Sequence, residues 1–454
     1  MSFRFLTSGA VVMTAAAALV VAGCSSSDSG SDGGSAASES VTVESTPAPP
    51  GLGLAQKLAC NPPKATPGPV STAPLKIGTL LPETGSLAFL GPPMVAGVNL
   101  AIKDINDAGG VLEKKVELIT GDSGDTTTDT ANATVDRELS GGVQVIIGAA
   151  SSSVSLKVID KIANAGVVMF SPANTSDEFT CYQDKGQYFR TAPADVLQAQ
   201  ALSQTMAEDG VQRVSILALN DPYGTGLADN TVKDLEAAGI PADQIQKIIY
   251  DPNAQSFNAE VDQVKNFNPD GIAVIGFEES AKIITRMHEV GIGPSDGKLV
   301  YGVDGNMGNA LGEAVGDGLL KGMKGTTPLT QTSGEFQSAL KELDPDLIDY
   351  NYSGESYDAT VLSALAAEAA KSTDGRAIAA NIIGVTNGDE ECDSYRKCLD
   401  LLKSGKTIAY VGKTGNLAFN AAGEPSVGSY GILEFDDSNT LLTPTRKYVS
   451  VAAQ

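Results

Sequence analysis

Short apolar runs alternate with segments of helical periodicity along most of this 454-residue chain, and the alternation occurs twice. The pattern predicts mostly parallel sheets wrapped by helices, because buried parallel strands are short and apolar on both faces. In the first half the expected strands are 75–81, 116–119, 143–147 and 167–170, with helices at 94–105, 128–139 and 154–163. In the second half the expected strands are 214–219, 247–250, 271–275 and 299–301, with helices at 227–238, 257–266 and 281–290.

Two similar half-chains predict an α/β protein of two Rossmann-like lobes, each a parallel sheet flanked by helices. The C-terminal part contains an Ala-rich helix at 359–371 and a hairpin-like stretch at 430–449. Because a tail of this size is able to complete both lobes, we expect three crossings that form a multi-strand hinge. The expected lobes are 75–193 with 326–425 and 194–325 with 426–454.

The N-terminus has the pattern of an export signal. Arg4 precedes an apolar run at 10–22, and Gly23 and Cys24 follow. The run is shorter than the roughly 20 residues of a membrane-spanning helix. Residues 1–23 are therefore expected to be a signal peptide, and its end resembles the bacterial lipobox, in which the cysteine is lipidated. The alternative is an ordinary secreted protein with an incidental cysteine.

Lipid on Cys24 would hold an exported protein at the outer face of the cell membrane. The next residues are rich in Ser, Gly, Ala and Pro. Such a composition buries no core, so residues 24–74 are expected to be a flexible tether.

The net charge of -24 argues against nucleic acid or an anionic lipid surface as a partner, since both bind Lys and Arg patches. The chain has one histidine and no tryptophan. This composition argues against haem and metal-imidazole chemistry, and we expect neither a cofactor nor a metal.

Five cysteines in an exported chain suggest disulfide bonds. With lipid on Cys24, four remain. Cys392 and Cys398 are close enough in sequence to close a small loop, and Cys60 and Cys181 are then left to pair. The alternative, a four-cysteine metal site, lacks the CxxC spacing that such sites use.

Polar residues gather in the loops that leave the carboxyl ends of the expected strands. In open parallel sheets ligands bind at these ends, where loops and helix N-termini converge. The structural alternative for any single Ser or Thr there is an N-cap. The six loops are 82–86, 149–153, 171–176, 220–224, 276–278 and 303–306.

Six sets of short motifs follow one another along the chain. They are Leu75-Lys76-Ile77-Gly78 with Thr84-Gly85, Ala101-Ile102-Lys103-Asp104-Ile105-Asn106 with Gly109-Gly110, Ile147-Gly148 with Ser151-Ser152-Ser153, Ser171-Pro172-Ala173-Asn174-Thr175, Arg190-Thr191-Ala192 and Tyr223-Gly224-Thr225-Gly226. In this order they resemble the leucine/isoleucine/valine-binding receptors of ABC importers, the type I periplasmic binding proteins. The similarity covers about 75–435, and the tail, with Cys392, Cys398 and Tyr430-Gly431-Ile432, is similar to the actinobacterial branch.

The resemblance implies roles for five residues that match the family's binding positions. Ser152, Ala173 and Thr175 would bind a ligand carboxylate through hydroxyls and backbone groups. Tyr223 would lie over the ligand, and Phe277 stands where the family often has a second aromatic side chain.

Three further positions depart from the family pattern. Asp304 stands where amino-acid binders place a glutamate for the ammonium group, so its acid is one methylene shorter. Leu90 replaces an aromatic residue of the side-chain pocket, and Ala150 replaces a larger residue. These changes imply a wider pocket and put leucine-like specificity in doubt.

The resemblance therefore implies a monomeric, extracytoplasmic receptor that closes on a small amino acid, amide or carboxylate and delivers it to an ABC permease. A secreted hydrolase is the first alternative, but the single histidine, His288, falls within a helical pattern away from the six loops. The second alternative is a sensing or adhesion protein on the same fold, because a fold does not determine function.

Overall fold

The first of two large sheets is all parallel, in the order β2-β1-β3-β4-β5. The computed structural model describes residues 60–329, 332–442 and 447–452, all within one compact unit, Ser45–Gln454. The strands are β1 (Lys76–Leu80), β2 (Glu117–Ile119), β3 (Val145–Gly148), β4 (Val168–Ser171) and β5 (Tyr188–Arg190). The helices are η1 (Ala88–Leu90), α2 (Gly91–Asp107), α3 (Thr130–Ser140), α4 (Ser152–Asn164) and η2 (Asp177–Cys181).

The second sheet has the order β15-β14-β10-β9-β8-β6-β7, in which β14 and β15 are antiparallel to their neighbours. Every residue of β6 and β8 is buried, as expected of strands covered on both faces. The strands are β6 (Val214–Leu219), β7 (Ile245–Tyr250), β8 (Gly271–Ile275), β9 (Leu299–Gly302), β10 (Lys324–Pro328), β14 (Val427–Glu434) and β15 (Lys447–Ala452). The helices are α5 (Asp195–Glu208), α6 (Pro222–Ala237), η3 (Ala242–Gln244), α7 (Asn258–Phe267), α8 (Ser280–Glu289), η4 (Pro294–Asp296) and α9 (Asn309–Ala314).

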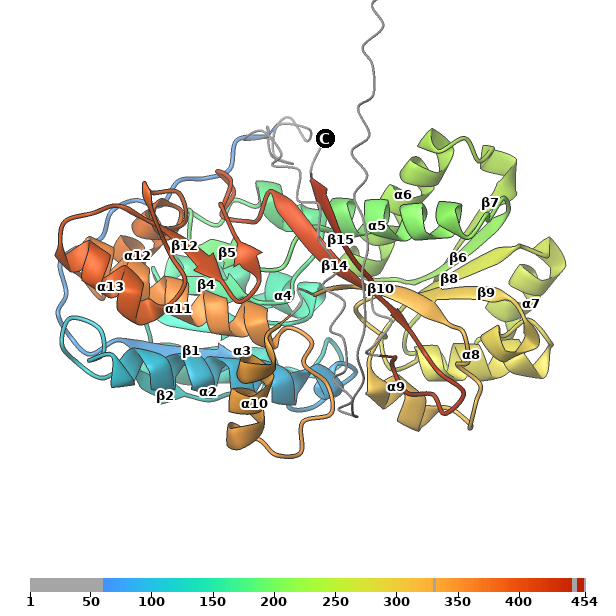
Figure 1. Ribbon diagram of the computed structural model, residues 1–454, viewed down its shortest axis with the longest axis horizontal. Coiled ribbons are helices and arrows are strands. Elements are labelled where there is room, and N and C mark those ends of the chain that lie inside the picture. Colours follow the sequence, from blue (N-terminus) through green and yellow to red (C-terminus); the bar gives the residue numbers. More distant parts are fainter. Residues whose placement is uncertain (1–59, 330–331, 443–446, 453–454) are drawn as a thin grey trace, which may run out of the picture. The chain divides into compact units, whose positions relative to one another are not determined.

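The segment between β10 and β14 packs largely on the first sheet and its helices. Its central helix α11 is buried around most of its circumference and lies against α2, as Figure 1 shows. A small sheet in the order β11-β12-β13 completes this segment. Its elements are α10 (Gly334–Leu343), α11 (Ser353–Ala370), α12 (Gly375–Ile382), η5 (Gly384–Thr386), β11 (Glu390–Cys392), α13 (Tyr395–Lys403), β12 (Ile408–Gly412) and β13 (Gly415–Asn416).

The expected α/β class and its parallel sheets are confirmed, with strand ends within about two residues of the expected ones. The hairpin-like stretch is the antiparallel pair β14 and β15. Four features were not predicted from the sequence, namely β5, α5, β10 and most of the segment after β10. The Ala-rich helix begins six residues before its predicted start, because the residues from Ser353 to Asp358 are mostly polar although they are buried. The residue boundaries of the lobes stay a prediction.

Both disulfide predictions are confirmed, since Cys60 is bonded to Cys181 and Cys392 to Cys398. The first bond attaches Cys60, within the predicted tether, to Cys181 at the end of η2. Ser71 adds a hydrogen bond of 3.1 Å to Thr373. The predicted signal peptide and Cys24 lie outside the described residues. Within the residues described, no helix combines the length and apolarity needed to cross a membrane.

Candidate functional site

One cavity lies where the carboxyl ends of strands from both large sheets meet. It encloses about 20 Å³, room for about one water molecule. All eight residues that the family resemblance singled out line it, although they come from six separate parts of the chain. The lining residues are Leu87, Leu90, Ala150, Ser151, Ser152, Ala173, Thr175, Tyr223, Phe277, Asp304, Gly305 and Tyr352.

Two polar side chains fix the loops that follow β3 and β4. The Ser171 hydroxyl donates to the carbonyl of Ala149 at 2.6 Å and accepts from the backbone N–H of Asn174 at 2.9 Å. The Asn174 amide then donates to the carbonyl of Ala150 at 2.8 Å. These bonds hold Ala173 and Thr175 at the cavity wall without using their side chains.

The N-terminus of α4 supplies the wall beside these loops. Ser151 is a true N-cap, because its hydroxyl accepts from the N–H of Val154 at 3.3 Å. Ser152 is the first helical residue, and its hydroxyl accepts from the N–H of Ser176 at 3.4 Å. The first N–H groups of a helix have no partner within it, and they attract anions. This wall therefore suits a carboxylate.

The opposite wall is aromatic and comes from the loops after β6 and β8. Tyr223 lies in the first turn of α6, whose N-cap Asp221 accepts from the Tyr223 N–H at 2.7 Å. The Tyr223 and Phe277 rings are stacked, with centroids 5.6 Å apart and planes 6° from parallel. The stacked rings give the wall a flat apolar surface.

Among the residues that the structure describes, Asp304 is the only acid that lines the cavity, and two tyrosines hold it. Tyr223 donates its hydroxyl to one carboxylate oxygen at 2.8 Å, and Tyr352 donates to the other at 2.6 Å. Burial raises the pKa of Asp304, while the hydrogen bonds from both tyrosines act against that rise. The arrangement presents an acceptor to any donor group in the cavity.

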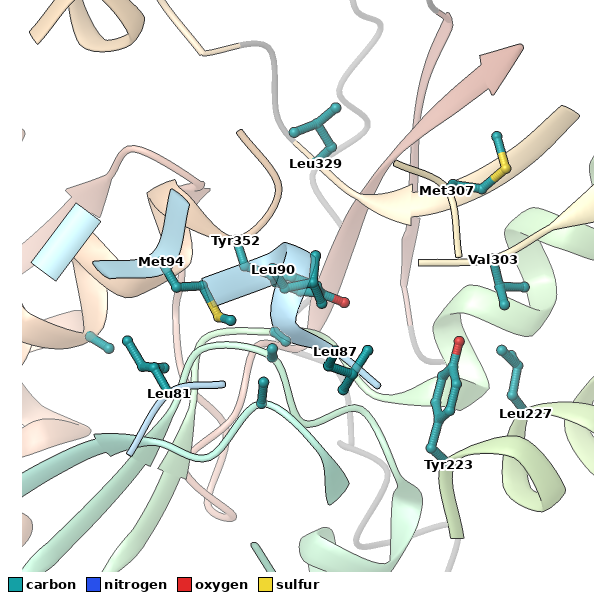
Figure 2. Close-up of a cluster of buried hydrophobic side chains, with 14 of the residues drawn as sticks. Leu81, Leu87, Leu90, Met94, Tyr223, Leu227, Val303, Met307, Leu329 and Tyr352 are labelled. Carbon is teal, nitrogen blue, oxygen red and sulfur yellow. The ribbon is translucent and has the colours of Figure 1, made fainter. Parts of the chain in front are cut away.

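Four lining residues were missed by the sequence analysis. Tyr352 is the most important of them, because it bonds Asp304 and ends the turn before α11 with a left-handed φ of 60°. Figure 2 shows Leu87 and Leu90, from the segment that leads into α2, with Tyr352 on one side and Tyr223 on the other. Leu87 and Gly305 lie close in sequence to the predicted site residues Leu90 and Asp304. Ser151 was predicted to lie in the loop 149–153 but was not assigned a binding role.

Further hydrogen bonds join the two sets of loops beside the cavity. The Ser153 hydroxyl, at the start of α4, bonds the Asp221 carboxylate at the start of α6. Asn230 of α6 donates to the Asp177 carboxylate of η2 at 2.5 Å. A solute of amino-acid size therefore needs the loops to separate before it enters. Within the described part of the chain, no group of three or more His, Cys, Asp or Glu side chains is arranged to hold a metal ion.

Known proteins resemble this chain over most of its length. A profile of the family described as periplasmic binding protein matches residues 74–390. Leu/Ile/Val-binding protein homolog 2 of Brucella abortus is 26% identical over 375 residues, 81% of this chain and 92% of that protein. Leu/Ile/Val-binding protein BraC3 of Rhizobium johnstonii is 27% identical over 225 residues, so the match spans 49% of this chain and 60% of BraC3. BasB of Halobacterium salinarum, a substrate-binding protein of a chemotactic signal transduction system, is 24% identical over 377 residues, 80% of this chain and 88% of BasB.

Solved structures show the same fold. LivJ of Streptococcus pneumoniae, a branched-chain amino acid transporter substrate-binding protein in complex with isoleucine, superposes with a TM-score of 0.68 at 21% identity, covering 84% of this chain and 100% of LivJ. A solute-binding protein of Rhodopseudomonas palustris in complex with p-hydroxybenzoic acid also gives 0.68, at 16% identity, covering 84% of this chain and 98% of that one. Because the family profile covers well over half of the sequence, the chain belongs to the periplasmic binding protein family, as its motifs predicted.

Proposed function

We propose that the protein is an extracytoplasmic solute receptor of an ABC importer, which binds a small amino acid, or a related amide or carboxylate, by closure of its two lobes. The observation that carries this proposal is a single cavity with complementary ends. The N-terminus of α4 lies at one side, and Asp304 lies at the other between two tyrosine hydroxyls. An α-amino acid carries the matching carboxylate and ammonium groups.

The proposed mechanism is binding on the first lobe followed by closure. The solute carboxylate would bind Ser152, Thr175 and the N–H groups of α4. Closure would then bring Tyr223, Phe277 and Asp304 over the solute. Contacts such as Ser153 with Asp221 form between the two sets of loops, so they favour the closed arrangement. A solute shifts this equilibrium only by binding the closed state more tightly than the open one.

Sensing without import is the second candidate function. The observation in its favour is the similarity to BasB, whose name places it in a chemotactic system. The same binding and closure would serve either role, with a permease or a signalling partner recognising the closed form. Deleting the gene for this protein distinguishes the two roles, since uptake of the solute would be lost only if the protein serves transport.

Catalysis has little support in the arrangement of polar groups. His288 lies at the C-terminal end of α8, exposed and away from the cavity. Its Nδ1 lies 3.2 Å from both the Ser295 hydroxyl and the Asp296 carboxylate. A hydrolytic triad needs its nucleophile and its acid on opposite ring nitrogens. The proposal therefore includes no chemical transformation of the solute.

Replacing Asp304 or Thr175 with alanine tests the site. We expect each change to weaken solute binding about 10- to 100-fold, because each removes a hydrogen-bonding group from a buried ligand. A thermal-shift screen of amino acids, amides and carboxylates identifies the solute, and calorimetry measures the affinities. Exposed Asp251→Ala and half-buried Thr285→Ala, both outside the cavity lining, are the matched controls. Unchanged affinity in both site variants would overturn the assignment.

Replacing Cys24 with serine tests the proposed anchor. We expect the variant to be released to the medium, because serine has no thiol to accept the lipid. Solute affinity should stay at the wild-type value, since the lipid does not take part in the site. Fractionation of cells followed by calorimetry checks both expectations, and retention of the variant on the membrane would contradict the anchor.

A further inference from the structure

A second chamber borders the cavity and shares one side chain with it. This chamber has a volume of about 150 Å³, several times that of the cavity itself. Phe277 lines both spaces and therefore lies between them, and we call it the partition. The rest of the chamber wall is mainly apolar and comes from η1 and α9. Its apolar residues are Ala88, Phe89, Ala310, Leu311 and Ala314.

The backbone that carries the partition is held firmly. The N–H of Phe277 donates to the Glu279 carboxylate at 3.0 Å, and the ring stacks on Tyr223. Gly305 lets the ring lie close, because a Cβ at that position would come within 2.9 Å of the Phe277 ring. Because the backbone is held, the partition moves by rotation of the Phe277 side chain, which gives up the stack on Tyr223 and would join the cavity to the chamber.

Polar groups at the chamber do not offer a second binding site for charge. The Asn306 amide is already used, since it donates to the carbonyl of Val274 at 2.9 Å and to the Ser280 hydroxyl at 3.0 Å, and its oxygen accepts from the N–H of Val303. Glu278 is exposed at the chamber and disfavours a second carboxylate. The chamber therefore suits an uncharged, apolar group.

We infer that the chamber receives the apolar end of the solute, with Phe277 as the specificity-determining partition. The inference rests on the proposed function, because the head group must first bind between α4 and Asp304. It narrows the solute class to amino acids or related monocarboxylates whose apolar end is larger than a short aliphatic chain, such as an aromatic ring. Burial of that end in the chamber stabilises the complex in proportion to its apolar area.

Filling the chamber tests the inference. Alanine, leucine, phenylalanine, glutamate and lysine are titrated calorimetrically into the full-length wild type, Ala310→Phe and the control Val95→Phe. Val95 lines a neighbouring surface hollow of about 430 Å³ and does not line the chamber, so added bulk there leaves the chamber open. We expect the wild type to bind phenylalanine more tightly than alanine. Ala310→Phe should weaken phenylalanine at least tenfold and leave alanine unchanged, whereas the control should change neither.

The outcomes separate the inference from the proposed function. If Ala310→Phe changes the affinities for alanine and phenylalanine equally, the chamber assignment is overturned while the receptor function stands. The same holds if the wild type binds glutamate or lysine more tightly than the other amino acids. No binding of any of these amino acids by the wild type would overturn the amino-acid form of the proposed function, and the inference with it. If Ala310→Phe does not fold, Ala314→Phe on the exposed side of the same wall carries the same test.

Discussion

Replacing Arg190 with methionine is expected to lower the free energy of unfolding by about 3–5 kcal/mol, because the change leaves a buried carboxylate without its counter-charge. Arg190 is the last residue of β5 and has no exposed side-chain surface, while its partner Glu424 is 3% exposed. The guanidinium donates to one Glu424 oxygen through Nε at 2.9 Å and through a terminal nitrogen at 2.5 Å. Urea unfolding of the variant and the wild type measures the loss.

Arg190 also connects the pair to the proposed carboxylate wall. Its other terminal nitrogen donates to the carbonyl of Ser176 at 2.8 Å and to that of Asn174 at 3.3 Å. These two residues flank Thr175, so the ion pair positions the loop that faces the cavity. We therefore expect the variant to bind solute less tightly as well, even though Arg190 does not line the cavity.

Two further variants show whether the loss comes from the unpaired charge. Arg190→Met with Glu424→Met should recover much of the stability, because a buried pair replaced by apolar residues is often tolerated. Lys103→Met removes an exposed ion pair with Asp107 and should change the unfolding midpoint little, since solvent screens that pair. If the double variant is no more stable than Arg190→Met, the lost stability does not come from the unpaired Glu424.

Much of the site was predictable because the carboxyl ends of parallel strands share one edge. The strands before Ser152, Thr175 and Phe277 have apolar runs clear enough to place these residues in loops at that edge. The order of strands within each sheet was not needed for this step. The family resemblance then assigned roles to particular residues, and all eight of them line one cavity.

The missed features depend on contacts between residues far apart in sequence. Tyr352 bonds an acid 48 positions earlier, and Glu424 pairs with an arginine 234 positions away. Separations of this length have no counterpart in the helix and strand periodicities from which the sequence was interpreted. The helix α5 was missed for a different reason, because Gln198, Ser203 and Thr205 are polar but buried, so its apolar pattern is weak.

Because several acids are buried, we expect the free energy of unfolding to decrease as the pH rises, and Glu138 of α3 is the clearest case. Its side chain is fully buried, and neither carboxylate oxygen has a hydrogen-bond partner of good geometry within the part of the chain that the structure describes. Gly78 of β1 lies so close that a Cβ there would come within 2.6 Å of the carboxyl carbon. Burial raises the pKa of Glu138 to about 8, against smaller opposing effects of Arg137 and the Thr79 backbone.

Glu138→Gln is therefore expected to make stability less dependent on pH. Near pH 7 the unfolded wild type has long lost the Glu138 proton, whereas most folded molecules still hold it. The stabilising contribution of the buried Glu138 is thus complete below its unfolded pKa of about 4.5. It is lost as the pH rises toward the folded pKa of about 8, by on the order of 3 kcal/mol between pH 5 and pH 8. The variant removes this contribution, while other buried acids, such as Glu355, remain in both proteins.

Urea unfolding at pH 5, 6, 7 and 8 measures the difference between Glu138→Gln and the wild type. Glutamine keeps the size of the side chain, so the difference in slope reports the proton and not the packing. Asp136→Asn is the matched control, because Asp136 lies on the exposed side of the same helix and its side chain is 67% exposed. The control should follow the wild-type slope. A Glu138→Gln slope equal to that of the wild type would mean that Glu138 ionises in the folded protein as readily as in the unfolded chain, with a partner supplied by solvent.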